Sequence, residues 1–236
     1  MLLLVSICCV ITGCVTNTPI TSKPIPERSD RSSVNQLGKN DFDRMADVEL
    51  AENTQSLRIL MLKLYKRNPH ELAKSTADNA EIMVEWVFEG DLQHHFKFKE
   101  IDNKQGTEAL FLAFDSAYPN DRVLPFIIGL QTMLLKAHNG KTDFYFTDKI
   151  EPQNIYNVAR NIEIAAWKLS TARDIHGNLY LLTNEINDID RNLSFEREFG
   201  KMIGRTDLYA ISLAEKSQRL ISRVMQSLAT AVFLPF

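Results

Sequence analysis

Five histidines are the first side chains to consider for metal or acid–base chemistry. His94 and His95 are adjacent, and adjacent side chains point to opposite faces of a strand and diverge on a helix. His70, His138 and His176 stand alone in the sequence, and no H-E-x-x-H spacing occurs. Because zinc needs three or four converging ligands, this pattern predicts no metal site.

Two groups of carboxylates have a spacing that could serve acid–base catalysis. Glu81 and Glu85 lie one helical turn apart, and Glu185, Asp188 and Asp190 cluster in one polar stretch. Paired carboxylates can divide the roles of acid and base when their environments differ. On an amphipathic helix, however, such pairs usually form a solvated face. We therefore expect no catalytic residue among them.

The glycines and the last basic residues offer no catalytic motif either. No G-x-x-x-x-G-K phosphate loop and no G-x-S-x-G serine elbow is present. Gly200 and Gly204 have the spacing of a close-packing helix motif, which predicts tight packing against a neighbouring soluble helix. Lys216, Arg219 and Arg223 predict a solvated face, and the alternative is contact with anionic lipid or a partner.

Composition and cysteine positions exclude further classes of function. The net charge is −3 with both signs interspersed, whereas a nucleic-acid binder needs a clustered basic surface. Cys8, Cys9 and Cys14 are the only cysteines of the 236 residues. The chain after Cys14 therefore has no disulfide, no thiolate metal site and no cysteine nucleophile. We expect no cofactor and no nucleic-acid partner.

The N-terminus carries the most specific pattern of the chain. Residues 2–10 are apolar and are followed by Ile11-Thr12-Gly13-Cys14. Counted from Leu2 through Gly13, this stretch of about twelve residues is shorter than the roughly 20 needed to span a bilayer, and it matches the apolar core of a secretory signal. The alternative is a buried apolar strand with an incidental cysteine.

Ile11-Thr12-Gly13-Cys14 resembles the lipobox of bacterial lipoproteins, and the resemblance covers the first fourteen to sixteen residues. It implies cleavage before Cys14, a thioether-linked diacylglycerol on Cys14 and often an N-acyl chain such as palmitate. Val15 follows in place of the aspartate that favours inner-membrane retention in this class, which implies the periplasmic face of the outer membrane. The remaining chain resembles no family that we identify.

Three parts follow from these patterns: a signal peptide over 1–13, a lipidated cysteine and flexible tether over 14–40, and a single helical domain over 41–236. The tether is rich in Ser, Thr, Pro and Asn, so it cannot bury enough apolar surface to offset the entropy of ordering. About 26 such residues have a root-mean-square span near 30 Å. The alternative role for this stretch is a partner-binding strip.

Apolar residues three and four positions apart predict an all-α domain of about seven helices, as an irregular bundle or stacked pairs. Asn68 and Pro69 predict the cap and first position of a short helix. Alternation near 94–101 and 143–147 predicts one minor β-hairpin, and the final apolar residues are expected to pack down. Helices are expected at 41–67, 75–88, 107–118, 122–138 and from 151 to 169, with a shorter one at 179–186. A final helix capped by Ser194 is expected to run for about 35 residues, and the alternative is a bend near Gly204.

These patterns predict a lipid-anchored, non-enzymatic accessory protein of the cell envelope. Its partners are expected to be the membrane, through lipid on Cys14, and another envelope component that the helical domain binds or scaffolds. The alternative is a periplasmic enzyme or small-ligand-binding protein with a pocket between helices. Six aromatic residues are candidates to line such a pocket: Trp86, Phe96, Phe114, Phe144, Tyr145 and Trp167.

Overall fold

Seven α-helices form the fold of the residues that the computed structural model describes, which are 39–89, 94–145, 149–187, 191–218, 221 and 232–236. An all-α fold with about seven helices and one minor hairpin is thereby confirmed. The elements in chain order are α1 (Asp41–Arg67), α2 (Pro69–Ser75), α3 (Ala80–Glu89), the 3-10 helix η2 (Lys99–Ile101), α5 (Gly106–Ala113), α6 (Val123–Ala137), α7 (Pro152–Thr171), β1 (Glu185–Ile186), β2 (Arg191–Asn192) and α8 (Ser194–Ser217).

Local signals explain where several helices begin. The Oδ1 atom of Asn40 accepts hydrogen bonds from the backbone N–H groups of Phe42 and Asp43, at 2.9 and 3.1 Å. The Asp43 carboxylate accepts from the Asn40 N–H at 2.8 Å, which completes a capping box. Pro69 and Pro152 occupy the first turns of α2 and α7, where a missing N–H has no helical partner to lose.

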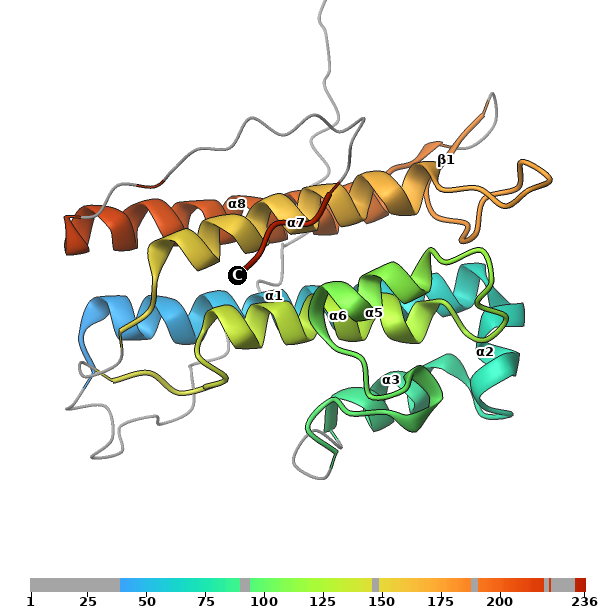
Figure 1. The fold of residues 1–236 in the computed structure, drawn as a ribbon, viewed down its shortest axis with the longest axis horizontal. Helices are drawn as coiled ribbons and strands as arrows, with labels where there is room; N and C mark the ends of the chain where they lie inside the picture. The colour runs from blue at the N-terminus through green and yellow to red at the C-terminus, as the bar shows by residue number, and fades with distance from the viewer. Residues whose placement is uncertain (1–38, 90–93, 146–148, 188–190, 219–220, 222–231) are drawn as a thin grey trace, which may run out of the picture. The chain divides into compact units, whose positions relative to one another are not determined.

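Four long helices enclose the main core. Helix α1 packs against α6 and α8, and α7 packs against the same two helices. Helix α5 lies along α6, and α3 packs against α1. In Figure 1, α7 and α8 run side by side as one layer, and α1, α5 and α6 form the layer below them. None of the described helices is long and apolar enough to cross a membrane.

Helix α6 is the buried centre that its sequence predicts. All of its residues except Leu135 and Lys136 are buried. Gly129 lets α5 approach closely, because a Cβ atom there would lie 2.7 Å from the Cγ atom of Leu110 and 2.8 Å from the carbonyl oxygen of Gly106. Among the described residues, Gly129 of α6 is therefore a close-packing glycine.

The predicted contact at Gly200 and Gly204 is wrong. Both glycines are exposed, and a Cβ atom on either would meet nothing within 4 Å. Helix α8 runs unbroken through Gly204 and ends at Ser217, where Gln218 has a left-handed conformation with φ of 52°. It is thus shorter than the expected 35 residues, and Ser194 is its first residue rather than its cap.

The hairpin lies elsewhere than expected. Residues 94–101 form a helix end, turns and η2 rather than a strand, and 146–147 lie outside the described residues. The strand pair instead joins β1 to β2, with Glu185 opposite Asn192 and Ile186 opposite Arg191. Turn-forming left-handed conformations at His95 and Phe96 interrupt the alternating apolar pattern.

The expected helix over 179–186 is also absent. The backbone there is extended and is held by Asn68, whose Oδ1 accepts from the Leu182 N–H at 2.7 Å. The Nδ2 group of Asn68 donates to the Leu182 carbonyl at 2.9 Å. A side chain more than 100 residues away in the chain therefore supplies the partners that a helix would have supplied locally.

Two further helix boundaries differ from the predicted ones. The stretch 75–88 is split, because Ser75 ends α2 and the Thr76 hydroxyl accepts from the Asp78 N–H in a tight turn. Helix α5 ends at Ala113 rather than near Tyr118. The guanidinium of Arg122 donates to the carbonyls of Ala113, Asp115 and Tyr118 at 2.7 to 2.9 Å. It thereby satisfies carbonyl groups that a longer helix would have used.

Candidate functional site

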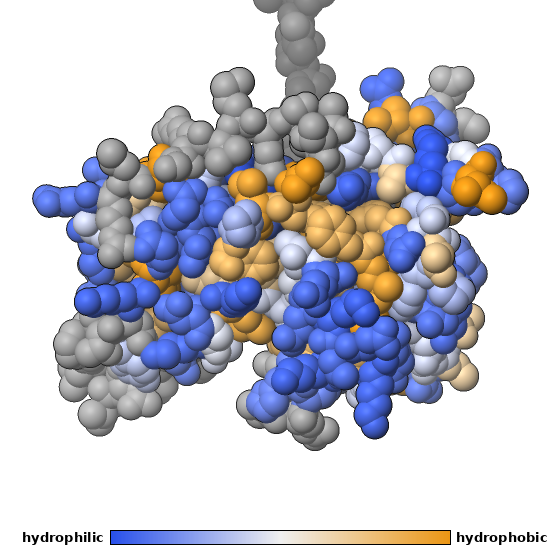
Figure 2. Space-filling view, viewed as in Figure 1, coloured by the Kyte–Doolittle hydropathy of each residue, from blue (hydrophilic) through white to orange (hydrophobic). Residues whose placement is uncertain are grey.

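The last five residues of the chain, 232–236, lie extended across α7 and end beside α6 (Figure 1). We call them the C-terminal tail. The tail confirms the expectation that the terminal apolar residues pack down. Phe233 is buried, whereas Val232 and Pro235 are exposed. Figure 2 shows the face on which it lies, with an apolar band between hydrophilic regions.

Asn161 of α7 holds the backbone of the tail. Its Oδ1 atom accepts from the Leu234 N–H at 2.6 Å, and its Nδ2 group donates to the Leu234 carbonyl at 2.8 Å. Asn161 is fully buried, and the nearest further partner of its Nδ2 is the sulfur of Met133 at 3.6 Å. One amide side chain thus pairs with both polar backbone groups of a single residue, in the way that one strand pairs with another.

A second amide extends this contact along the same helix. Nδ2 of Asn157 donates to the Pro235 carbonyl at 2.7 Å, and Gln153 donates to Oδ1 of Asn157 at 2.8 Å. The three amides are spaced four residues apart, so they form a row on one face of α7. The tail runs antiparallel to the helix, since Leu234 meets Asn161 and Pro235 meets Asn157.

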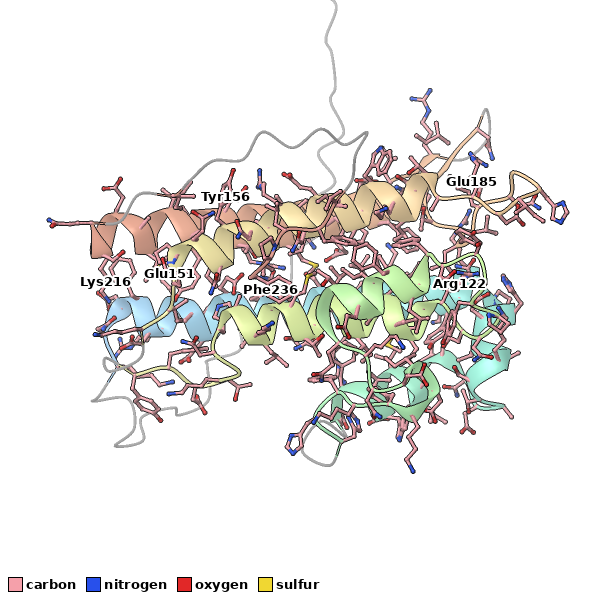
Figure 3. The ribbon with its side chains drawn as sticks, in the orientation of Figure 1. Arg122, Glu151, Tyr156, Glu185, Lys216 and Phe236 are labelled. Atoms are coloured by element: carbon pink, nitrogen blue, oxygen red, sulfur yellow. The ribbon has the colours of Figure 1, made fainter. Side chains whose placement is uncertain are left out.

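Two aromatic rings fix the tail at either side of this row. The Phe233 ring packs edge-on against Phe111 of α5, with centroids 5.3 Å apart, and Lys168 Nζ lies 6.0 Å from its centroid. The Phe236 ring, labelled in Figure 3, has Lys136 Nζ at 5.0 Å from its centroid. We define the tail-binding surface by the residues that make these contacts: Phe111, Lys136, Asn157, Asn161 and Lys168.

Gly106 provides room for the second ring. A Cβ atom at Gly106 would lie 3.2 Å from Cζ of Phe236, and its φ of +56° is one that L side chains rarely adopt. Its N–H donates to the Thr132 hydroxyl at 2.7 Å, and that hydroxyl donates to the Ile128 carbonyl at 2.6 Å. Both the conformation and the hydrogen bond therefore hold this part of α5 against α6, with Phe236 beside it.

A cavity of about 810 Å³ adjoins Phe236 and has mixed polar and apolar walls. Turns form much of its rim, since His95, Asn103 and Asn139 all have left-handed conformations. Gln105 stabilises one rim turn by donating to the carbonyl of His95 at 3.0 Å. The volume falls within the range of ligand-binding clefts, about 300–1,000 Å³.

Most residues that the sequence singled out for chemistry do not meet at this place. His95 and Phe96 line the cavity, but His94 turns away and packs on Phe98 with ring centroids 4.4 Å apart. His70 and His176 are exposed, in contrast to the buried His138. Of the six aromatic candidates, only Phe96 lines this cavity: Trp86, Phe114, Phe144, Tyr145 and Trp167 do not.

Two of the carboxylate candidates, Glu81 and Glu185, form solvated ion pairs. Glu81 and Glu85 are exposed, and Lys66 lies 2.6 Å from Glu81. The hydrogen bond from Lys66 lowers the pKa of Glu81. Glu185 pairs with Arg67 at 2.8 Å, whereas Asp188 and Asp190 lie outside the described residues. Lys216 lies over the ring of Phe42, and Cys14, Arg219 and Arg223 are likewise outside the described part of the chain.

A buried carboxylate elsewhere has a strongly altered environment. Asp121 accepts hydrogen bonds from the Tyr65 hydroxyl at 2.6 Å, the Ser75 hydroxyl at 2.7 Å and the Val123 N–H at 2.8 Å. Burial raises the pKa of Asp121, although these hydrogen bonds oppose the shift. Burial also raises the pKa of Tyr65 well above 10, and the Asp121 charge adds to that shift. Because Asp121 accepts from the first turn of α6, we interpret this cluster as a helix cap.

The described part of the chain contains no group of three or more His, Cys, Asp or Glu side chains that could hold a metal ion. Comparison with protein-family models, with curated proteins and with solved structures finds no match. The tail-binding surface and its adjoining cavity are therefore interpreted from their own chemistry.

One sequence pattern pointed to this surface, and it is separate from the apolar spacing that predicted the helices. Gln153, Asn157 and Asn161 repeat at intervals of four, directly beside the apolar stripe of α7. A row of amides beside a buried stripe predicts side chains that need polar partners. Which backbone would supply those partners could not be read from the row itself.

Proposed function

We propose that this chain is a lipid-anchored, non-enzymatic accessory protein of the cell envelope whose helical domain binds another protein. The observation that carries the proposal is the paired hydrogen bonding of the Asn161 side chain to both backbone groups of Leu234. Side chains that recognise backbone groups can hold an extended segment largely independently of its sequence, as in strand-addition modes of peptide recognition.

The anchor in this proposal rests on the resemblance of Ile11-Thr12-Gly13-Cys14 to a lipobox. Two or three acyl chains at about 0.8 kcal/mol per buried CH₂ group make a durable anchor. A tether of about 26 residues gives the domain a reach of roughly 30 Å from the lipid. An anchored domain with such a reach is suited to capturing a segment of another envelope protein.

The proposal is tested by site-specific photo-crosslinking in living cells. A photoreactive residue replaces Thr142, which is exposed at the cavity beside the tail, and in a control it replaces Ile175, which is 88% exposed in a loop after α7. We expect a discrete crosslinked protein in the membrane fraction from position 142 only. The full chain without photoreactive residue serves as the background control.

Competition decides whether the crosslinked protein uses the tail-binding surface. Crosslinking in isolated membranes is repeated with an excess of a peptide that has the sequence of residues 232–236. We expect the peptide to reduce the yield at position 142. Equal crosslinking at positions 142 and 175, or no crosslinked protein at either position, contradicts the proposed function.

A small-ligand-binding protein is the second candidate, and the cavity of about 810 Å³ beside Phe236 favours it. Native mass spectrometry of the chain purified from envelopes would then show a bound small molecule. Thr142→Trp places a large ring at the exposed cavity wall, so this variant should lose the added mass. A retained adduct in Thr142→Trp would exclude the cavity as its site.

A further inference from the structure

Asn161 lies on the buried side of α7, where an unsatisfied amide is costly. Ile155, Val158, Ile162 and Ala165 of the same helix are fully or almost fully buried, and Asn161 has no exposed surface. Both polar backbone groups of Leu234 satisfy this amide. If the tail leaves, the amide loses both partners, and either water or another extended backbone must replace them.

The surface contacts aromatic side chains at two positions. Phe233 and Phe236 are three residues apart, and each ring has a lysine Nζ within 6.0 Å of its centroid. A cation near an aromatic face favours an aromatic ring over an aliphatic side chain of similar size. Val232 and Pro235 are exposed, so their side chains contribute little to selection.

The backbone requirement is equally specific. The residue at the position of Leu234 must have an N–H group, because Asn161 accepts from it. The next residue contributes only its carbonyl, which Asn157 binds, and here that residue is a proline without an N–H. The ligand of the tail-binding surface is therefore an extended segment with aromatic residues at its second and fifth positions and a residue other than proline at its third.

We propose that the tail-binding surface is a recognition site for extended peptides of this class from a partner protein, and that residues 232–236 are its intramolecular competitor. The inference rests on the proposed function and names the ligand of that site. A partner segment binds only when the tail has left the surface. The tail therefore lowers the apparent affinity for the partner segment.

An intramolecular competitor weakens binding by a predictable amount. A segment of the same chain acts at an effective concentration of the order of millimolar. For a peptide that binds the vacant surface with a micromolar dissociation constant, the apparent dissociation constant in the intact chain is then higher by roughly 100-fold or more. Wild-type protein should consequently bind little peptide in the micromolar range.

The experiment uses the full chain and a fluorescent peptide, Val-Phe-Leu-Pro-Phe, measured by fluorescence anisotropy. In the tail-released variant, Phe233→Lys and Phe236→Lys place a cation beside Lys168 and Lys136, which repel the tail from its own surface. We expect the peptide to bind this variant at least about tenfold more tightly than the wild-type chain. Circular dichroism establishes that the variant keeps its helices.

Two controls test the geometry of binding. A peptide methylated on the leucine nitrogen lacks only the N–H that Asn161 accepts, so it should bind the tail-released variant about tenfold more weakly or worse. Adding Asn161→Leu to that variant should have the same effect, whereas Asn178→Ala changes an exposed amide in the loop after α7 and should have none. Equal binding of the methylated and unmethylated peptides overturns the proposal, as does a folded tail-released variant that binds neither.

Hydrogen exchange of the wild-type chain gives a test that needs no variant. If the tail leaves by local opening, the Leu234 amide should exchange at least about 100-fold faster than the amides of α6. Exchange at the rate of α6 would mean that the tail leaves only on global unfolding, which overturns the proposal even if the tail-released variant fails to fold.

The mass of the wild-type chain in solution shows whether the ligand comes from a partner protein or from a second copy of this chain. We expect a monomer by light scattering at all concentrations. A dimer that disappears in the tail-released variant would make the ligand the tail of a second copy and overturn the assignment to a partner protein. Peptide binding that fails while crosslinking at position 142 succeeds would reject this inference and leave the proposed function standing.

Discussion

The Oε2 atom of Glu49 lies 3.1 Å from Nε2 of His138, and the two side chains are 4% and 0% exposed. The Nδ1 atom of His138 lies 2.8 Å from the Leu134 carbonyl, which can only accept, so Nδ1 donates. Neither Nε2 nor Oε2 has a hydrogen-bond partner among the described residues, so the two groups approach each other without a hydrogen bond. The other carboxylate oxygen accepts from Asn53 and Thr206 at 2.5 and 2.6 Å, so this cluster joins α1, α8 and the end of α6.

Removal of both members of this pair should cost less stability than the two single removals added together. We expect Glu49→Leu to lower the free energy of unfolding by about 3–5 kcal/mol, because Asn53 and Thr206 keep buried donors without their acceptor and His138 loses the carboxylate beside its Nε2. The double variant Glu49→Leu, His138→Leu should lose less than the sum of the single variants, with a coupling of about 0.5–3 kcal/mol. Urea denaturation measures all four states, and strict additivity would show that the pair is not coupled.

Replacement by alanine should destabilise the fold at the close-packed Gly129 and stabilise it at the exposed Gly204. Gly129→Ala places a Cβ atom 2.8 Å from the Gly106 carbonyl, a backbone atom that cannot rotate away, and should cost about 1–3 kcal/mol. Gly204→Ala meets nothing within 4 Å and should stabilise α8 by about 0.5–1 kcal/mol. Thermal unfolding of both variants provides the comparison, and a loss of stability in Gly204→Ala would contradict it.

Tyr65 should make the fold sensitive to alkali. Burial first, and then the charge of Asp121, raises its pKa well above the ordinary value of 10. The unfolded chain therefore loses this proton first, so the stability contribution is fully present below pH 10 and is lost as the pH rises above it. We expect the free energy of unfolding to fall above pH 10, and to fall less steeply in Tyr65→Phe.

Other tyrosines also contribute to the fall in the free energy of unfolding above pH 10, so Tyr65→Phe removes only part of it. Burial raises the pKa of Tyr118 to about 12, and it also raises the pKa of Tyr209. Both therefore add to the alkaline loss in wild-type protein and in Tyr65→Phe alike. Tyr156→Phe, on α7, is the matched control, and an unchanged slope in Tyr65→Phe would contradict the prediction.

Cys14 should determine whether the chain stays with the membrane. In Cys14→Ser, the thioether-linked lipid cannot form, and we expect the protein to move from the membrane fraction to the soluble fraction. Mass spectrometry of the mature wild-type N-terminus should show acylated Cys14 as the first residue. An unmodified cysteine in a chain that still begins at Met1 would contradict the lipoprotein proposal.

Local patterns were sufficient for the helices whose signals lie within a few residues. Helix α6 was predicted within one residue of each end, and α7 begins at the predicted proline, because apolar spacing, proline and turn residues act over three or four positions. The predicted helix over 179–186 was wrong for the opposite reason. Its backbone partners belong to Asn68, which no local pattern connects with it.

The sequence by itself determined the all-α class, the buried central helix and the packing of the terminal apolar residues. Only the tertiary structure decided that Asn161 would meet Leu234, 73 positions later, and that Glu49 would meet His138. Burial of apolar stripes is non-directional and leaves many polar pairings open. Each buried polar side chain then requires one specific partner, and the packing of distant helices selects it.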